Sequence, residues 1–306
     1  MKNILQTINL TKKYGPYTAV ENLSLAVQQG EIYGFLGLNG AGKTTTIRIL
    51  LGMIKPTSGD VFWFGKSLRD KTFASWDRLG FMVETPGAYS NLTVIENLEI
   101  VAKLRGVRSK TLINDVVVRL RLDPYRNKKA GQLSLGNAQR LGLAKAIFHR
   151  PEVLILDEPT NGLDPAGIIE VRNLLKEMAE NDGVTIFVSS HILGEISRLV
   201  TRFGIIHKGR LQIELNAGQL AKLTSKVLRV STSDARALQL LRSQGFEGIA
   251  TADPLELIIE DEKALKHPEM IARILVNAGY DVKHLMIERE DLEHFFVRTI
   301  NAIDHE

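Results

Sequence analysis

GLNGAGKTT, residues 37 to 45, carries the strongest structural signal in this chain. It fits the pattern G-x-x-x-x-G-K-[ST] and lies where the apolar segment IYGFLG meets the helix-like segment TTTIRILLGM. The pattern needs that context, because glycines let successive backbone N–H groups wrap a phosphate and the following helix N-terminus adds a favourable dipole. The stretch therefore predicts a P-loop, in preference to a glycine-rich turn without a nucleotide.

Side chains in two motifs fit a phosphate and its metal. Lys43 would neutralise the β and γ phosphates, and the Thr44 hydroxyl would bind Mg²⁺. In VLILDEPTNGLDP, residues 153 to 165, an apolar strand ends in two acids. Asp157 can hold the metal shell, and Glu158 can polarise an attacking water on the other side of the γ-phosphate. A solvated strand end is the alternative for this acidic pair, and the P-loop on the same chain disfavours it.

Three further places in the sequence are candidates for contact with a nucleotide or its metal. In LSLGNAQRLGLAKAI, Ser134 and the Gly136 amide stand at a predicted helix start, as a plain N-cap or as a second anion site. His191 follows the strand VTIFVSS and is either a packing residue or a γ-phosphate contact. Glu84 ends the apolar run in FMVETPGAY, where it either meets water before a turn or faces a metal or phosphate.

Strands alternate with helices up to about residue 215, which predicts a mainly parallel sheet covered by helices. Between about residues 88 and 150 the strand signals give way to helical periodicity, so we expect an inserted helical subdomain there. The clearest strands are expected at residues 31–37, 153–157, 184–190 and 203–211.

The pattern changes again in residues 216–306, where strand and helix signals follow the order β-α-β-β-α-β. That order predicts a small α+β accessory domain of ferredoxin-like type. A final amphipathic helix is expected at LEHFFVRTI, residues 292 to 300.

Composition narrows the class of protein only slightly. At 306 residues the chain can hold two domains, and 39 basic against 35 acidic side chains, a net charge of +4, imply neither a nucleic acid nor a lipid partner. With no cysteine there is no disulfide framework and no thiolate metal site. The chain lacks an apolar run of about 18 residues, so we expect any membrane span to come from a partner.

Together these motifs resemble the nucleotide-binding subunit of an ABC transporter, in family order over residues 1 to about 215. GLNGAGKTT is similar to the Walker A motif, LSLGNAQR to the signature, VLILDEPT to Walker B, NGLD to the D-loop and SSHI to the H-switch. The resemblance places Tyr14, in TKKYGPY, at the aromatic position that stacks on adenine, and Glu84 at the Q-loop. The resemblance implies that the catalytic residues are Glu158, His191 and Lys43. It implies that the nucleotide is bound by Tyr14, Asn39, Gly40, Ala41, Gly42, Lys43, Thr44, Thr45, Ser134, Gly136 and Asp164. It implies that the metal is bound by Thr44, Glu84 and Asp157.

The resemblance also implies a P-loop ABC-type ATPase fold, in which an antiparallel β subdomain and the helical insert flank the core sheet. It implies ATP and Mg²⁺ as ligands, a head-to-tail homodimer, integral-membrane permease subunits as partners, no nucleic-acid partner, and a place at the cytoplasmic face of a bacterial membrane. Residues 84–97 would then meet the membrane subunit. Leu135 and Asn137 depart from the glycine and glutamine of the signature, which leaves the strength of its phosphate contact open.

Within the family, the sequence is most similar to the ATPases of bacitracin-resistance and lantibiotic-immunity exporters. The block IYGFLGLNGAGKTTTIRILLGMIKPTSG, the glutamate at residue 84, NLTVIENL and the ending DLEHFFVRTI carry this finer likeness. Bacterial multidrug, sodium and polysaccharide exporters share much of the first block and remain alternatives. A soluble ABC ATPase, a non-hydrolysing scaffold and a nutrient importer are the more distant ones.

Overall fold

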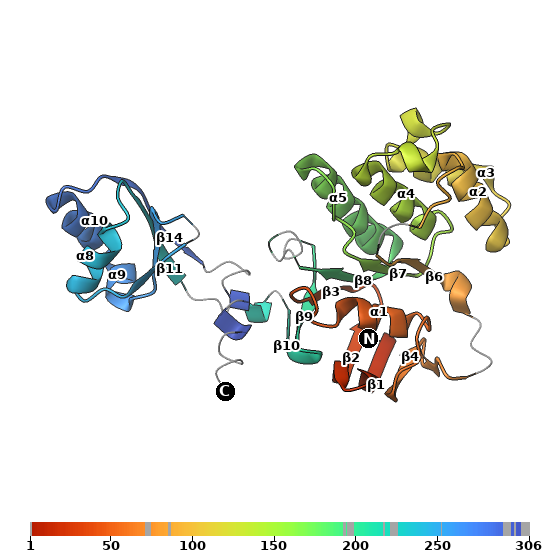
Figure 1. The fold of residues 1–306 in the computed structure, drawn as a ribbon, viewed down its shortest axis with the longest axis horizontal. Helices are drawn as coiled ribbons and strands as arrows, with labels where there is room; N and C mark the ends of the chain where they lie inside the picture. The colour runs from red at the N-terminus through yellow and green to blue at the C-terminus, as the bar shows by residue number, and fades with distance from the viewer. Residues whose placement is uncertain are drawn as a thin grey trace. The chain divides into compact units, whose positions relative to one another are not determined.

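The computed structural model describes residues 2–70, 75–84, 87–191, 194, 199–216, 218–220, 226–251, 253–289, 295–296 and 298–300. The chain divides into two compact units, Met1–Ala217 and Gly218–Glu306 (Figure 1). The assignment of residues 1–215 and 216–306 as separate domains stays a prediction.

A six-stranded sheet forms the middle of the first unit. Its strands are β3 (Ile32–Leu36), β6 (Leu79–Met82), β7 (Val153–Asp157), β8 (Thr185–Ser190), β9 (Arg202–His207) and β10 (Arg210–Asn216). They lie in the order β10-β9-β3-β8-β7-β6, parallel from β9 to β6. Every residue of β3, β7 and β8 is buried, which explains why these strands are apolar on both faces. Because β3, β8 and β7 are neighbouring parallel strands, their carboxyl ends meet at one edge of the sheet.

The single strand predicted at residues 203–211 is wrong, because the chain turns back within it. Strands β9 and β10 form an antiparallel hairpin in which Arg210 pairs with His207. The two residues of the turn, Lys208 and Gly209, both have positive φ angles, 47° and 81°. Two such residues in succession make the turn that suits the twist of a hairpin. Glycine alone signals this turn in the sequence, since lysine rarely adopts that conformation.

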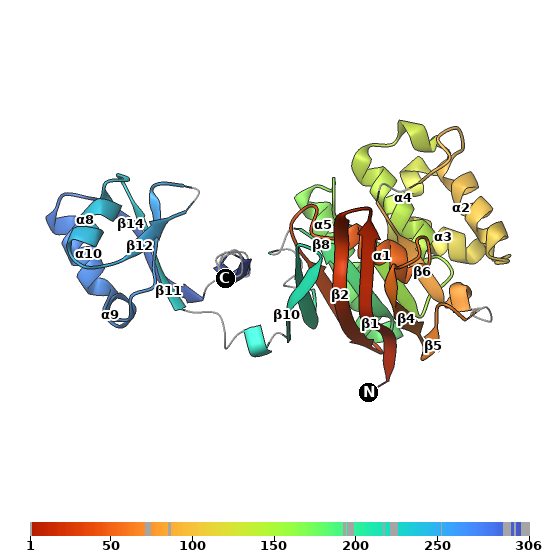
Figure 2. The same ribbon diagram turned by 60° about the horizontal axis from the view of Figure 1, so that its bottom comes forward.

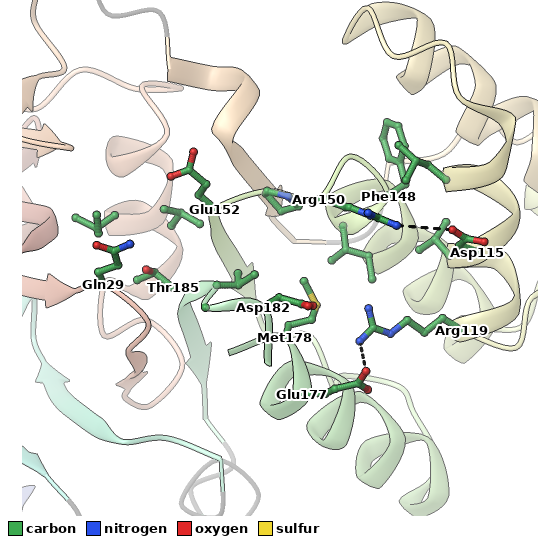
Figure 3. Close-up of a pocket in the computed structure, with 18 of the residues that line it drawn as sticks. Gln29, Asp115, Arg119, Phe148, Arg150, Glu152, Glu177, Met178, Asp182 and Thr185 are labelled. Atoms are coloured by element: carbon green, nitrogen blue, oxygen red, sulfur yellow. Dashed lines mark ion pairs between the residues drawn. The ribbon is translucent and has the colours of Figure 1, made fainter. Parts of the chain in front are cut away.

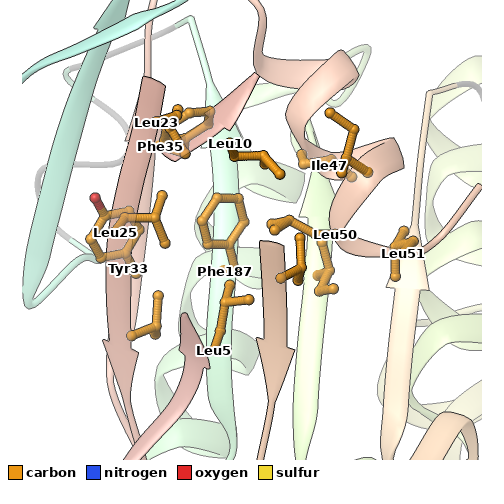
Figure 4. Close-up of a cluster of buried hydrophobic side chains, with 14 of the residues drawn as sticks. Leu5, Leu10, Leu23, Leu25, Tyr33, Phe35, Ile47, Leu50, Leu51 and Phe187 are labelled. Atoms are coloured by element: carbon orange, nitrogen blue, oxygen red, sulfur yellow. The ribbon is translucent and has the colours of Figure 1, made fainter. Parts of the chain in front are cut away.

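An antiparallel sheet lies beside the core sheet, and helix α1 (Lys43–Leu50) packs with both. Its strands, in the order β2-β1-β4-β5, are β1 (Asn3–Tyr14), β2 (Tyr17–Gln28), β4 (Ser58–Trp63) and β5 (Lys66–Ser67). Figure 4 shows Phe187 of β8 among side chains from β1, β2, β3 and α1. The Trp63 indole donates a hydrogen bond to the Leu50 carbonyl at 2.8 Å. Burial of each large apolar side chain stabilises the fold by about 1.5–3 kcal/mol, so this core holds the start of α1 firmly against β3.

The predicted helical insert is confirmed. It contains α2 (Val94–Leu104), α3 (Lys110–Arg119) and α4 (Leu135–Ile147), which gather on one side of the first unit (Figures 1 and 2). Side chains of Thr93, Ser109 and Ser134 cap the three helix starts. The long helix α5 (Pro165–Asp182) follows β7. Within the described residues, no helix combines the length and apolar character needed to cross a bilayer.

The second unit is an antiparallel sheet with helices. Its elements are β11 (Lys226–Thr232), α8 (Ala237–Ser243), β12 (Gly248–Ala250), β13 (Glu256–Ile259), α9 (Glu262–Lys266), α10 (Pro268–Asn277) and β14 (Val282–Arg289). The strand order β12-β13-β11-β14, with every pair antiparallel, is the split β-α-β arrangement of ferredoxin-like units. This confirms the predicted topology, to which the structure adds the short helix α9. The predicted helix at residues 292–300 is helical at 295–296 and 298–300, and its other residues lie outside the described ones.

Candidate active site

The loop between β3 and α1 forms a backbone cradle. Gly42, which precedes the helix, has a φ of 110°, and Gly40 has a φ of 80°, conformations that residues with side chains rarely adopt. A Cβ on Gly42 would lie 2.5 Å from the Ala19 carbonyl oxygen, so the loop also needs glycine for space. The first N–H groups of α1 have no partner within the helix and carry its positive dipole end. The loop therefore fits an anion such as a nucleotide phosphate.

Lys43 is held inside this loop by main-chain oxygens. Its side chain is only 6% exposed, and Nζ donates to the Gly37 carbonyl at 2.7 Å and to the Leu38 carbonyl at 3.3 Å. Nζ also lies 3.3 Å from Glu158 Oε1. A buried ammonium group is stable only with such partners. The protein thus places one positive charge at the centre of the predicted phosphate site.

Thr44 and Asp157 lie together beside the cradle, although 113 residues separate them in the sequence. The Thr44 hydroxyl donates to Asp157 Oδ2 at 2.8 Å, and the Ser189 hydroxyl donates to Asp157 Oδ1 at 2.5 Å. The neighbouring parallel strands β7 and β8 bring about the second contact, because Asp157 is in register with Ser189. A hydroxyl beside a carboxylate is a donor set that suits Mg²⁺ bound to a nucleotide. The residues present therefore fit the implied metal.

Glu158 follows in a left-handed conformation, with a φ of 51°. Its amide N–H bonds to the carbonyl and hydroxyl oxygens of Ser189, and its side chain is 20% exposed. Oε1 lies beside Lys43, while Oε2 lies 2.7 Å from His191 Nδ1 and accepts the His191 N–H at 3.3 Å. Of the three predicted catalytic residues, Glu158 thus contacts both of the others, Lys43 and His191.

Two adjoining cavities, each of about 280 Å³, surround this cluster and share Thr44 and Glu158. The first is lined by Tyr14, Tyr17, Ala19, Asn39, Gly40, Gly42, Lys43, Thr44, Thr45 and Glu158. The second is lined by Thr44, Glu84, Leu135, Gln139, Asp157, Glu158 and Asn161. Most of the predicted residues are therefore collected around one site.

Tyr17, Gln139 and Asn161 were missed among these lining residues. Tyr17 pairs with Tyr14 across the β1–β2 hairpin and is 59% exposed. The second tyrosine of TKKYGPY was the signal for it, because residues that face each other across a short turn lie side by side. Asn161 stands in the quoted NGLD segment and Gln139 in the quoted LSLGNAQR segment, but no feature of the sequence singles out either residue.

Glu84 lines the second cavity, but it also has a partner that the sequence did not indicate. It follows β6 with a φ of 57°, and its carboxylate lies 2.5 Å from the guanidinium of Arg48 on α1. The two side chains are 51% and 39% exposed. Glu84 is thus near Thr44 and Asp157, as predicted for a metal contact, while Arg48 balances its charge. The next residues, Thr85 and Pro86, lie outside the described ones.

Ser134, Gly136 and Asp164 do not line either cavity around their own P-loop. Ser134 is exposed and accepts the Asn137 N–H at the start of α4. Asp164 is exposed and accepts the Gly167 N–H at the start of α5. These helix starts are near each other, since a Cβ on Gly136 would lie 3.3 Å from the Gly162 carbonyl oxygen. Within one chain, the second predicted phosphate site is therefore separate from the first.

A larger cavity, about 670 Å³, lies elsewhere in the first unit. Its lining includes Glu152 and Thr185, at the amino ends of β7 and β8, together with residues of α3 and α5 (Figure 3). Arg119 of α3 pairs with Glu177 of α5 across it at 2.9 Å. Ligands of open α/β sheets bind at the carboxyl ends of strands, which is the opposite edge. Its lining contains none of the predicted site residues, so size does not identify the active site here.

Comparisons with known proteins agree with this geometry. The sequence profile of the ABC transporter family matches residues 20–161. The chain is 44% identical to the bacitracin transport ATP-binding protein of Bacillus licheniformis, over 99% of both chains. It is 36% identical to a lantibiotic transport ATP-binding protein of Streptococcus pyogenes, over 69% of this chain and 90% of that one. A dimeric ATP-binding cassette in a post-hydrolysis state with ADP and Pi is similar in structure, with a TM-score of 0.64 and 28% identity over 69% of this chain and 98% of that one.

Proposed function

This chain belongs to the ABC transporter family of ATP-binding subunits, and from that membership we propose that it powers the export of a peptide antibiotic such as bacitracin or a lantibiotic. The observation that supports the substrate class is the full-length match to the bacitracin transport protein, which includes the second unit.

The chain is an ATPase, and its cofactor is Mg²⁺. We assign the phosphates to the cradle and Lys43, and the metal to Thr44 and Asp157. When bound, Mg²⁺ supplies positive charge to the phosphates. Glu158 is placed to take a proton from the attacking water, and the contact with His191 Nδ1 holds its carboxylate in one orientation. Tyr14 and Tyr17 offer aromatic faces on which the adenine base of ATP can stack.

We propose that two copies of the chain are needed to complete each site. Ser134, Gly136 and Asp164 lie outside the cavity of their own P-loop, and Ser134 and Asp164 are exposed. In a head-to-tail dimer, the start of α4 from one copy would cover the nucleotide of the other. ATP then favours the closed dimer and hydrolysis releases it, which is a shift between two conformational populations.

A permease partner at the cytoplasmic face of a bacterial membrane follows from the family, and residues 84–97 are our candidate contact. The structure changes which residue should probe it. Glu96 and Thr93 form a capping box at the start of α2: the Glu96 carboxylate accepts the Thr93 N–H at 2.7 Å, and the Thr93 side chain accepts the Glu96 N–H. Hydrogen bonds from the Thr93 N–H and hydroxyl hold the pKa of Glu96 below its usual range. A charge reversal at Glu96 would therefore damage α2 itself. Tyr89 is 57% exposed and is the better probe.

Export is tested by co-expressing the chain with the membrane subunit that co-purifies with it in an antibiotic-sensitive bacterium. We expect the pair to lower susceptibility to bacitracin or a lantibiotic several-fold, and we expect the same pair carrying Glu158→Gln to give no protection. Protection against neither antibiotic by a pair that assembles and hydrolyses ATP would contradict this substrate class. Susceptibility to a small cationic drug is the matched comparison for a multidrug exporter.

Replacing Glu84 with glutamine should change the response to Mg²⁺. A carboxylate attracts the metal with a full charge, whereas an amide offers a neutral carbonyl. An interaction of about 1 kcal/mol, typical of charges about 4 Å apart in water, corresponds to roughly a three- to tenfold change. We therefore expect Glu84→Gln to raise the Mg²⁺ concentration for half-maximal hydrolysis by about that factor, with ATP affinity retained.

The control for this substitution is Glu21→Gln, which also removes an exposed carboxylate paired with an arginine, Arg210. Magnesium titrations of ATP hydrolysis would be compared between the two variants and the wild-type protein. An unchanged titration curve for Glu84→Gln would leave Glu84 as a strand-end residue that merely pairs with Arg48.

A further inference from the structure

Gln139 makes an unexpected contact with the main chain of Glu158. Of the side chains in α4, all of whose residues are described, Gln139 is the polar one that is buried, with 5% exposure. Its Nε2 donates to the Glu158 carbonyl oxygen at 2.9 Å. It lies three residues after Gly136, so both stand on the same side of the helix, one turn apart.

The conformation of Glu158 makes this contact significant. A left-handed backbone costs a residue with a Cβ about 1–2 kcal/mol, so neighbouring bonds must hold it. The Glu158 N–H is held by Ser189, and its carbonyl accepts from Gln139 and from the Asn161 N–H at 3.2 Å. These bonds fix both peptide groups of Glu158. They thereby set the direction in which its side chain leaves the backbone toward Lys43 and His191.

A second contact joins α4 to the same segment. The side chain of Leu135 covers Gly162, because a Cβ on Gly162 would lie 2.4 Å from Leu135 Cδ2. Gly162 has a φ of 77°. The first turns of α4 therefore touch the segment after β7 at two points, Glu158 and Gly162. Leu135 and Gln139 also line the cavity that contains Thr44 and Asp157.

We propose that Gln139 is a positioning residue, which holds Glu158 in its catalytic orientation and ties it to the start of α4. This inference rests on the proposed dimer, in which that helix start meets the nucleotide of the other copy. A shift of α4 on closure is then passed to Glu158 through the Gln139 amide. The catalytic carboxylate keeps its aim only while α4 stays seated against the segment after β7, so a movement of α4 changes the rate of hydrolysis.

The test is Gln139→Met in the full-length protein, since methionine has nearly the same shape and lacks the amide donor. Misplacement of a catalytic group by about 1 Å can lower a rate by about 100-fold. We expect kcat to fall roughly ten- to thirtyfold, with KM and the affinity for an ATP analogue changed by less than about twofold. That split distinguishes lost positioning from lost binding.

The matched control is Arg140→Met, one residue along the same helix. Arg140 joins α4 to Glu170 of α5 at 2.8 Å, and Glu170 keeps its other partner, Arg121, in this variant. It therefore loosens α4 without touching Glu158. We expect its kcat to stay within about threefold of wild type, and thermal unfolding would report the stability of both variants.

A second comparison places Gln139→Met in the Glu158→Gln background. If Gln139 acts through Glu158, the residual slow hydrolysis of that background should not fall further. Equal fold losses in both backgrounds, or a loss of kcat in Arg140→Met as large as in Gln139→Met, would overturn the proposal. ATP hydrolysis is the readout throughout, so a failure to export antibiotics would refute the substrate class and leave this result intact.

Discussion

Replacing Glu158 with glutamine should nearly abolish steady ATP turnover while leaving ATP binding intact. The amide keeps the size of the side chain, but it loses the negative charge that accepts a proton from water. General-base catalysis contributes about 10²–10⁴-fold to a rate, so we expect kcat to fall by about 10³-fold. The loss of charge next to Lys43, 3.3 Å away, also removes a competitor for that ammonium group. Phosphate binding should therefore be kept or strengthened.

Two measurements follow turnover and assembly separately in this variant. Phosphate release gives kcat, and light scattering after size exclusion gives the mass with and without ATP. We expect ATP to trap the variant as a dimer, because binding is retained and the step that reopens the dimer is blocked. Glu152→Gln is the control, since Glu152 precedes the same strand at its other end and pairs with Arg78. Hydrolysis by Glu158→Gln at the wild-type rate would contradict the catalytic assignment.

The sequence predicted functional residues well where they lie together in one contiguous segment. The P-loop could be predicted because a strand, a glycine-rich turn and a helix start follow one another, and Asp157 and Glu158 because they end an apolar strand. Their convergence followed from the rule that parallel strands end at one edge. The family resemblance added Tyr14 and Asp164, for which the residues alone carried no strong signal.

Contacts between distant segments could not be predicted in the same way. Arg48 and Glu84 are 36 residues apart, and their pairing depends on how α1 packs near the end of β6. Gln139 reads as an ordinary polar residue of a helix, and only the fold shows that its side chain is buried against Glu158. Such contacts arise from packing geometry, which composition and periodicity do not encode. The contacts found this way, of Arg48 with Glu84, of Gln139 with Glu158 and of Leu135 with Gly162, all involve segments that the motifs had already indicated.

The same distinction applies to the signature segment. Its motif predicted an anion site at Ser134 and Gly136, and the structure places these residues at a helix start outside the cavity of their own P-loop. A motif reports which groups are present, whereas the fold reports which of them can act together within one chain. Here Ser134 and Gly136 do not line the cavity of their own P-loop, and that separation is why we propose that a second copy completes each site.

Replacing Lys43 with methionine should remove most of the affinity for ATP. The Lys43 side chain is 6% exposed and its ammonium group is fixed by the Gly37 and Leu38 carbonyls, so it is positioned before the nucleotide arrives. Methionine fills similar space without the charge. A loss of about 3 kcal/mol, in the range for breaking a buried charge contact, corresponds to roughly a 100-fold rise in Kd. Glu158 would also lose its cationic neighbour and repel the phosphates more strongly.

The measurement is a titration with a fluorescent ATP analogue, which reports binding without turnover. Lys176→Met is the control, because Lys176 lies on α5 in an exposed pair with Glu180 and should leave Kd unchanged. Circular dichroism would confirm that each variant is folded, since Lys43→Met leaves the Gly37 and Leu38 carbonyls without that donor. Wild-type affinity in a folded Lys43→Met protein would show that the cradle binds phosphate through its backbone alone. The buried ammonium group would then serve mainly to neutralise Glu158.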